Sequence, residues 1–295
     1  MRDVEGKVAF ITGGGSGVGF GMAKAFAGAG MRVAIADVRD DHLEEATASL
    51  GAGVHAIRLD VTDRAAFARA ADETERVLGH VDVLCNNAGI NLFNDIAEAT
   101  YQDWDWVLGV NLGGVVNGVV TFVPRMKAHG GRGHVVNTAS MGAFVAGPGA
   151  GLYTTAKFGV LGLSDALRWS LLPHGIGVSV VCPGLVKSKI YESDLTRPPP
   201  LATDTTPADP EFMRILPGLH EAGMDPDEIG AKVLRAVERN DFYVFTHPDH
   251  REELRQIFDD VLAAFPDEPI PPDRAAVEEG RRAGKEAARA AWPGD

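Results

Sequence analysis

Three side chains in the middle of the chain could together move a proton. Tyr153 and Lys157 lie four residues apart, which places them one turn apart on the same face of a helix. An ammonium group beside a phenol favours the phenolate, so this pairing predicts that the pKa of Tyr153 falls below its usual value of about 10. Ser140 ends a strand-like run, HVVNTAS, and a glycine-rich turn separates it from the tyrosine. A tyrosine tuned in this way can act as an acid or base near neutral pH.

Tyrosine and lysine at this spacing are also common on solvated helix faces, so the rest of the chain must decide. A glycine-rich turn, TGGGSGVG, runs from Thr12 to Gly19 between a strand-like run and a helical pattern. It fails the G-x-G-x-x-G fingerprint, because Val18, Phe20 or Met22 falls on the sixth place. Its glycines still allow backbone N–H groups to approach a pyrophosphate at the positive end of the following helix.

An acidic residue follows at the distance expected for ribose recognition. Asp37 ends the next strand-like run, 20 residues after Gly17. A carboxylate there can accept hydrogen bonds from the adenosine ribose, and its charge would repel a 2′-phosphate. The sequence therefore favours NAD over NADP, although Arg39 could weaken that preference. The alternative for Asp37 is an ordinary turn residue.

Alternating strand and helix patterns position these residues. Apolar runs predict buried strands at 7–12, 32–37, 54–60, 81–89, 134–140, 177–184 and 242–247. Helical patterns lie between them, at about 22–30, 41–50, 64–78, 102–129, 153–172 and 227–240, with another at 251–265. The crossover lengths imply a parallel sheet with helices on both faces. We therefore expect an α/β Rossmann fold, a doubly wound parallel sheet of about seven strands with an extended C-terminal helical end.

Composition narrows the partners and the compartment. The net charge is −13 and the pI about 5.1, without a basic stripe, so no nucleic-acid partner is expected. We expect no apolar run to reach the roughly 18 residues of a membrane span, and the N-terminus lacks a signal-peptide pattern. Cys85 and Cys182 lie in apolar runs and predict buried thiols in a reducing cytoplasm. No metal is expected, since the nine histidines are scattered and His247 and His250 share a turn with no third partner.

Two segments suggest surfaces for a ligand and for a partner. The proline-rich segment 188–226 follows the end of a strand, where ligand loops sit, and the alternative is a disordered surface loop. Residues 107–123 of the long helix are apolar on most of its surface, which predicts burial against more than one partner. We expect a homodimer or homotetramer. Residues 1–265 would form one dehydrogenase domain, and the tail 266–295 would be a loosely packed helix or partly disordered.

Eight short motifs in order resemble the short-chain dehydrogenase/reductase family in its single-domain form. The resemblance covers about residues 7–188. It rests on TGGGSGVG, Asp37, LDV at 59–61, NNAG at 86–89, Asn111, NTAS at 137–140, YTTAK at 153–157 and PGLVKS at 183–188. It implies an NAD(P)-dependent enzyme that interconverts a secondary alcohol and a ketone by hydride transfer.

The resemblance also implies a role for each residue. Tyr153 would be the catalytic acid/base, Lys157 would lower its pKa and bind the nicotinamide ribose, and Ser140 would hold the substrate oxygen. Asn111 would hold a water that links Lys157 to solvent. Ser188 stands where the family more often has threonine, and its hydroxyl can still bind the carboxamide. The implied cofactor-binding set is Gly13, Ser16, Gly17, Val18, Gly19, Asp37, Asp60, Val61, Asn87, Ala88, Gly89, Tyr153, Lys157, Pro183, Gly184, Val186 and Ser188.

Longer stretches, including VNLGGVVNGVVTFVPRM, show a looser resemblance to the Cα-dehydrogenases of bacterial lignin breakdown, which oxidise a benzylic alcohol with NAD. Apolar residues near the expected site fit such a substrate, and each could equally belong to the core. These candidate wall residues are Leu92, Phe93, Met141, Phe144, Val145, Leu185, Leu195 and Phe212. Two alternatives remain open: NADPH-driven reduction of a ketone of steroid-like or polyketide-like type, and a non-catalytic nucleotide-sensing protein.

Overall fold

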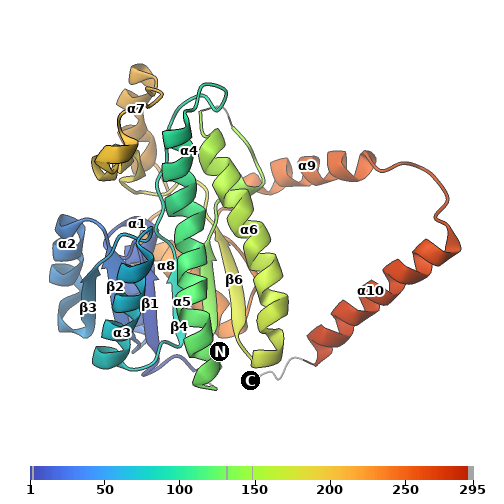
Figure 1. The fold of residues 1–295 in the computed structure, drawn as a ribbon, viewed down its shortest axis with the longest axis horizontal. Coiled ribbons are helices and arrows are strands. Elements are labelled where there is room, and N and C mark those ends of the chain that lie inside the picture. The colour runs from blue at the N-terminus through green and yellow to red at the C-terminus, as the bar shows by residue number, and fades with distance from the viewer. Residues whose placement is uncertain (2, 131, 148, 292–295) are drawn as a thin grey trace.

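A sheet of seven parallel strands forms the centre of the molecule (Figure 1). The computed structural model describes residues 1, 3–130, 132–147 and 149–291. The strand order is β3-β2-β1-β4-β5-β6-β7, which confirms the doubly wound Rossmann prediction. The strands are β1 (Val8–Thr12), β2 (Arg32–Asp37), β3 (Val54–Arg58), β4 (Val83–Asn86), β5 (His134–Thr138), β6 (Gly177–Cys182) and β7 (Tyr243–Phe245).

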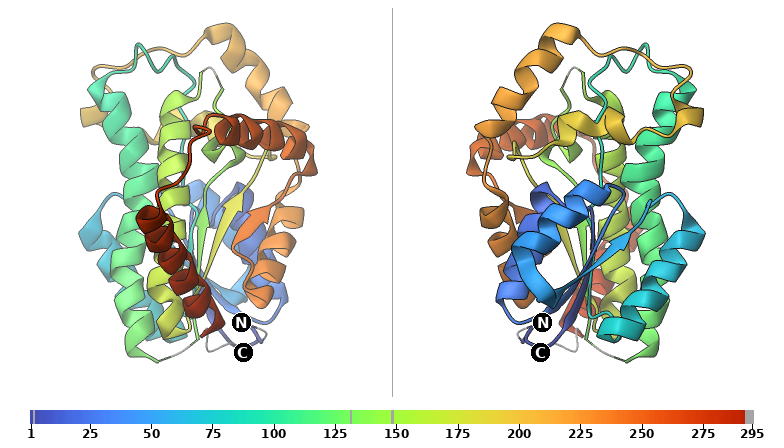
Figure 2. Two further views of the ribbon diagram at one scale, coloured as in Figure 1. Left: turned by 90° about the vertical axis from the view of Figure 1, so that its right-hand side faces the viewer. Right: turned by 90° about the vertical axis from the view of Figure 1, so that its left-hand side faces the viewer.

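Helices cover both faces of the sheet (Figure 2). Helices α1 (Gly17–Gly28), α2 (Asp40–Leu50) and α8 (Pro226–Arg239) pack on one face through a cluster that includes Phe26 and Ile229. Helices α3 (Arg64–Leu78), α5 (Gly114–Ala128) and α6 (Gly151–Leu171) pack on the other face, where the rings of Phe10, Phe67 and Phe122 meet. Because these strands are buried on both faces, they are apolar along nearly their whole length.

The long helical run before β5 is interrupted at its centre. Helix α4 (Tyr101–Leu108) passes through a π-helical segment (Gly109–Gly113) into α5. Thr100 caps the start of α4, where its hydroxyl accepts a hydrogen bond from the Asp103 backbone N–H. The sequence gives no signal for the π-helical turn, which places Asn111 at the point where the backbone ladder changes.

The run Tyr101–Ala128 is long and apolar enough to cross a membrane, with a mean hydropathy of 1.6 in its most apolar window. The prediction that no apolar run reaches the length of a membrane span is therefore wrong. Half of that window is buried inside the fold, where the run packs beside α3 and α6 (Figure 1). A core helix of an α/β fold passes the same composition test, so the run gives only weak support for a membrane span.

The chain after β6 forms short helices and an arm. The proline-rich segment 188–226 contains two 3-10 helices (Ile190–Thr196 and Pro199–Leu201) and helix α7 (Pro210–Glu221). Beyond β7, a short turn (Pro248–His250) leads into α9 (Arg251–Ala263) and α10 (Pro272–Ala290). These two helices extend from the body and return to it (Figure 1), and the Lys285 ammonium lies 5.0 Å from the Trp169 ring.

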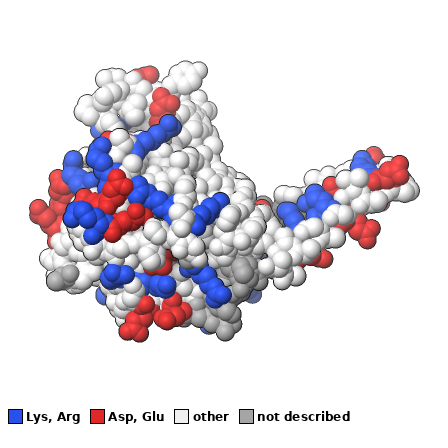
Figure 3. Space-filling view, turned by 60° about the horizontal axis from the view of Figure 1, so that its bottom comes forward, with Lys and Arg blue, Asp and Glu red and all other residues white. Residues whose placement is uncertain are grey.

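The tail was expected to be either a loosely packed helix or partly disordered, and its described part forms helix α10. Figure 3 shows basic and acidic side chains on the arm, and it shows side chains of both charges interspersed on the visible face of the body.

Two short 3-10 turns complete the description: Gly51–Gly53 before β3 and Leu172–His174 after α6. A third, Met141–Ala143, follows β5 and belongs to the cleft described next.

Candidate active site

One cavity of about 650 Å³ lies at the carboxyl ends of the strands, across the point where the strand order reverses between β1 and β4. Parallel strands end at the same edge, so residues from distant parts of the sequence meet there. The cavity is lined by nearly all the predicted site residues: Gly13, Ser16, Gly17, Val18, Asp37, Asp60, Val61, Asn87, Ala88, Gly89, Ser140, Tyr153, Lys157, Pro183, Gly184, Val186 and Ser188. Gly19 and Asn111 do not line it.

The turn after β1 needs glycine for two reasons. Gly13 and Gly17 have φ values of 63° and 50°, in the left-handed region that side chains disfavour. At Gly19 the reason is packing, because a Cβ there would lie 2.0 Å from the Gly13 carbonyl oxygen. Gly19 therefore supports the turn from behind, whereas the sequence prediction placed it against the pyrophosphate.

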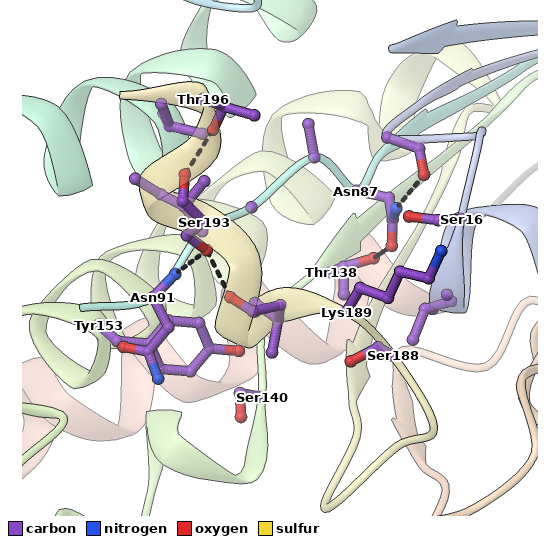
Figure 4. A pocket seen from close by; sticks show the side chains of 18 of the residues that line it. Ser16, Asn87, Asn91, Thr138, Ser140, Tyr153, Ser188, Lys189, Ser193 and Thr196 are labelled. Atoms are coloured by element: carbon purple, nitrogen blue, oxygen red, sulfur yellow. Dashed lines mark hydrogen bonds between the residues drawn. The ribbon is translucent and has the colours of Figure 1, made fainter. Parts of the chain in front are cut away.

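Asn87, which follows β4, forms hydrogen bonds with the end of β1 and with the end of β5. Its side-chain amide donates to the Thr12 carbonyl oxygen at 3.0 Å. The same amide accepts from the Thr138 hydroxyl at 3.0 Å (Figure 4). Its backbone N–H donates to the Thr12 hydroxyl at 2.9 Å. Asn87 thus lines the cavity and also fixes the spacing of three strand ends.

Asp37 lies where the sequence places it, at the end of β2. Its carboxylate accepts hydrogen bonds from the backbone N–H groups of Gly15 at 3.2 Å and Arg39 at 3.1 Å. Arg39 also lines the cavity, but two carboxylates engage its guanidinium. It donates to both oxygens of Asp41 and, at 2.8 Å, to Glu192.

Ser140 and Tyr153 meet at the other end of the cavity. The Ser140 hydroxyl accepts from the Gly142 backbone N–H at 3.0 Å and lies 3.4 Å from the Pro183 carbonyl oxygen. Burial raises the pKa of the Tyr153 phenol, and its contact with the Ser140 hydroxyl only partly opposes this. The prediction of a lowered pKa for Tyr153 is therefore wrong for the chain alone, because the cost of desolvating the phenolate dominates.

Lys157 and Asn111 converge on the turn after β4. Lys157 is 2 % exposed, and its ammonium donates to the Thr138 carbonyl oxygen at 2.8 Å. Burial lowers its pKa to about 8. The Asn111 amide donates to the carbonyl oxygen of Ile90 and accepts from its N–H, both at 2.8 Å. A Cβ on Gly89 would lie 3.2 Å from Asn111 Oδ1 and 3.4 Å from Lys157 Nζ, so both side chains end over this glycine.

Cys182 ends β6 near this group, and Cys85 lies in β4, which β5 separates from β6. Both thiols are free and buried, as the sequence predicts. Burial raises the pKa of Cys182 to about 12, and the nearby Lys157 ammonium only partly offsets this. A thiol with so high a pKa is not a nucleophile at neutral pH. In the described ranges of the chain, no group of three or more His, Cys, Asp or Glu side chains could hold a metal ion.

The apolar walls agree with half of the candidates chosen from the sequence. Phe93, Met141, Val145 and Leu185 line the cavity. The other four candidates do not line it. Leu92 belongs to the core, and Leu195 is 73 % exposed. The Phe144 ring makes tilted and edge contacts with Phe245 and Phe258, and the Phe212 ring makes an edge contact with Phe93. Trp106 and Leu201 also line the cavity and were not predicted.

Two further lining residues, Ser193 and His250, were not among the site candidates chosen from the sequence. Ser193 accepts a hydrogen bond from the Asn91 backbone N–H at 3.0 Å, which joins segment 190–196 to the turn after β4 (Figure 4). Arg197 donates to the buried Asp103 carboxylate at 2.7 Å. His250 enters from the turn after β7 and packs against Gly184. Because the proline-rich segment lacks periodicity, its sequence does not indicate which of its side chains make these contacts.

The features of the cleft fit a nicotinamide dinucleotide. The backbone of the glycine turn lines the cavity at Gly17. A Cβ at Gly17 would lie 3.2 Å from Ser188 Cβ and would narrow the cavity at this point. Asp37 stands at one end for a ribose, and Ser140 and Tyr153 stand at the other end for the reacting group. The cavity volume also falls within the range of roughly 300–1,000 Å³ that is usual for small-molecule sites.

Known proteins agree with this geometry. The family model for short chain dehydrogenases matches residues 7–197. A C alpha-dehydrogenase of Sphingobium sp. (strain NBRC 103272 / SYK-6) is 44 % identical over 266 residues, covering 89 % of this chain and 87 % of the relative. LigO from the same strain, solved in its apo form, has a TM-score of 0.78 and 42 % identity, covering 97 % of this chain and 98 % of that chain.

A cofactor complex is also among the similar structures. A short chain dehydrogenase/reductase from Burkholderia phymatum, in complex with NAD, has a TM-score of 0.85 and 32 % identity, covering 92 % of this chain and 100 % of that one. The match extends over the strands and turns that form the cavity described above. The chain therefore belongs to the short-chain dehydrogenase/reductase family and is an NAD(P)-dependent alcohol oxidoreductase.

Proposed function

We propose that the enzyme oxidises a bulky, hydrophobic secondary alcohol of benzylic type to its ketone, with NAD as the cofactor. The observation that carries the proposal is the apolar wall beside Ser140 and Tyr153, formed by Phe93, Trp106, Met141, Val145, Leu185 and Leu201. Aromatic rings bury large apolar areas against such walls. The similarity to a C alpha-dehydrogenase supports the same substrate class.

Tyr153 is the catalytic acid/base in this proposal. In oxidation its phenolate takes the proton of the alcohol hydroxyl, and the Ser140 hydroxyl donates a hydrogen bond to the alcohol oxygen. A nicotinamide bound beside Tyr153 would supply the hydride acceptor and, when oxidised, a positive charge near the phenol. In the reverse direction Tyr153 returns its proton to the ketone oxygen. The balance is one proton and one hydride removed from each alcohol.

Lys157 and Asn111 support the acid/base role of Tyr153. The Lys157 ammonium donates to the nicotinamide ribose hydroxyls and stabilises the Tyr153 phenolate electrostatically. Asn111 holds the turn after β4 through both of its bonds to Ile90 and positions a water that passes protons between Lys157 and solvent.

The remaining predicted residues hold the cofactor. The backbone N–H groups of Gly13, Ser16, Gly17 and Val18 would hold the pyrophosphate, with Gly19 supporting their turn. Asp37 accepts from the adenosine ribose, which favours NAD because a 2′-phosphate would face its charge. The other groups contact the adenine, the nicotinamide ribose or the carboxamide: Asp60, Val61, Asn87, Ala88, Gly89, Pro183, Gly184, Val186 and Ser188.

A panel of secondary alcohols tests the substrate class. Benzylic, steroid and aliphatic alcohols would be supplied with NAD or NADP, and NADH or NADPH formation would be followed by absorbance. We expect the highest kcat/KM for a benzylic alcohol with NAD. Oxidation of only small aliphatic alcohols would contradict the substrate class, and a strong preference for NADP would contradict the role of Asp37.

We also propose that the enzyme is a cytoplasmic homo-oligomer. Val116 and Val120 on α5 and Phe158 on α6 form an exposed apolar strip, with Val120 67 % exposed. Exposed apolar surface of this kind is typical of a subunit interface. The division into a domain of residues 1–265 and a tail of 266–295 remains part of this proposal. Light scattering of Val120→Asp and wild-type protein would test the assembly: an unchanged mass in the variant would contradict the interface.

A further inference from the structure

Arg39 lies at the ribose end of the cavity, and acidic partners occupy its guanidinium. Nε and Nη2 donate to the two oxygens of Asp41 at 3.0 and 2.5 Å. Nη1 donates to Glu192 Oε2 at 2.8 Å. These hydrogen bonds, Asp41 first, raise the pKa of Arg39 further above its already high usual value. The side chain is therefore a cation whose principal donors are already in use.

Glu192 reaches Arg39 from a distant part of the sequence. It belongs to segment 190–196, which follows β6, and it lies 153 positions beyond Arg39. Both residues line the cavity, and their side chains are 20 % and 30 % exposed, so water screens the pair only in part. The ion pair thus links the cofactor end of the cleft to the segment that also closes its substrate end.

The neighbours of Glu192 hold it in this position. Ser193 accepts from the Asn91 backbone N–H at 3.0 Å and donates to the Ile190 carbonyl oxygen at 2.5 Å. Arg197, at the end of the same segment, is anchored to Asp103. Releasing Arg39 from Glu192 therefore requires either a new rotamer of Glu192 or a shift of a segment that has two further anchors.

An arginine just beyond β2 would ordinarily suit a 2′-phosphate, because its planar fork binds phosphate oxygens in pairs. Here a phosphate carrying about −1.5 to −2 charges would meet the carboxylates of Asp37, Asp41 and Glu192 around the Arg39 guanidinium. Asp37 and Asp41 lie on either side of Arg39 in sequence, whereas Glu192 comes from the substrate segment. Glu192 is thus the acidic partner of Arg39 that the sequence around β2 does not predict.

We propose that Glu192 is a specificity-determining residue that disfavours NADP by occupying the guanidinium of Arg39. The substrate segment then contributes to cofactor choice as well as to the alcohol pocket. The inference rests on the proposed use of NAD, and it adds a determinant that lies outside the β2 region. It predicts that removing the Glu192 charge frees Nη1 of Arg39 for a phosphate oxygen, while Asp37 and Asp41 stay in place.

Equilibrium binding tests this without turnover. Dissociation constants of NADH and NADPH would be measured by quenching of protein fluorescence for wild type and Glu192→Gln. We expect the ratio Kd(NADPH)/Kd(NADH) to fall at least tenfold in Glu192→Gln, mainly through tighter NADPH binding. Asp194→Asn is the matched control: it removes one charge from the same segment at an exposed position, and its ratio should stay within twofold of wild type.

A second variant separates specific from general effects. In Glu192→Gln/Arg39→Met the gain in NADPH binding should disappear, because the freed guanidinium is its cause. A ratio unchanged in Glu192→Gln, or parallel loss of both cofactors, would overturn the inference and assign Glu192 a purely structural role. Tighter binding of NADPH than NADH by the wild type would instead contradict the proposed use of NAD, so the two failures are distinguishable.

Discussion

The Lys157 ammonium lies 5.4 Å from the centre of the Tyr153 ring, and its hydrogen bond goes to the Thr138 carbonyl oxygen. The pair is therefore adjacent, as the four-residue spacing predicts, but the two groups are not directly hydrogen bonded to each other in the described contacts. Burial dominates both of them: it raises the pKa of Tyr153 and lowers that of Lys157 to about 8. The chain alone thus holds a neutral phenol, and forming the phenolate requires added positive charge.

Removing the phenol hydroxyl should abolish turnover without disturbing the cleft. We expect Tyr153→Phe to lower kcat by about 10²–10⁴-fold, the usual contribution of a positioned acid/base, and to leave the NADH dissociation constant within about twofold of wild type. Tyr101→Phe is the matched control, since Tyr101 is 89 % exposed and should retain full activity. Initial rates and fluorescence titration measure the two effects. Substantial turnover by Tyr153→Phe would show that another group moves the proton.

The pKa of Lys157 predicts how cofactor binding responds to pH. The buried lysine is charged below about pH 8 and neutral above it, whereas an unfolded lysine keeps its proton to about 10.5. If the ammonium binds the ribose, NADH binding above pH 8 requires proton uptake, so Kd should rise by up to tenfold per pH unit. NADH titrations from pH 6 to pH 9.5 would show this as a bend near pH 8 in the plot of log Kd against pH. In Lys157→Met we expect weaker binding without the bend, and a bend that persists there would belong to another group.

The crossing of α1 and α8 depends on glycines that have no room for a side chain. A Cβ on Gly230 would lie 2.0 Å from the Gly21 carbonyl oxygen, whereas a Cβ on Gly28, also in α1, would meet nothing within 4 Å. We expect Gly230→Ala to destabilise the fold by about 1–3 kcal/mol through overpacking. Gly28→Ala, the control, should be neutral or stabilising by about 0.5–1 kcal/mol. Urea unfolding measures both, and equal stability of the two variants would contradict the close packing.

Local patterns predicted the sheet, its helices and most of the cleft, because each of these is encoded within a short stretch. Asp37 and Tyr153 follow directly from strand ends and helix spacing. The contacts that sequence reasoning missed, such as Arg39 with Glu192, join segments far apart in the chain and have no periodic signal. The pKa direction of Tyr153 was missed for a different reason: neighbours can be counted in a sequence, but the depth of burial that outweighs them cannot.

The buried ion pair between Arg197 and Asp103 fixes the substrate segment to α4. Asp103 is fully buried and the Arg197 side chain is 7 % exposed. Burial of the carboxylate opposes its ionisation, but hydrogen bonds from Arg197, Thr100 and Thr206 outweigh this and lower the pKa of Asp103. Arg197 also donates to the Leu201 carbonyl oxygen at 2.6 Å and lies over the Trp106 ring, and these last two residues line the cavity. The pair thus sets the position of two walls of the alcohol pocket.

Breaking this pair should therefore loosen the alcohol pocket more than the cofactor site. Removing one partner of a buried pair typically costs about 3–5 kcal/mol, because the other charge stays buried. We expect Arg197→Met to raise KM for the alcohol at least tenfold while the NADH Kd stays within about threefold. Asp103→Asn/Arg197→Met should recover part of the loss, since it removes the stranded charge. Arg214→Met, an exposed arginine on α7, is the matched control and should behave as wild type. If Arg197→Met raised KM and Kd equally, the ion pair would support the fold as a whole rather than the substrate pocket.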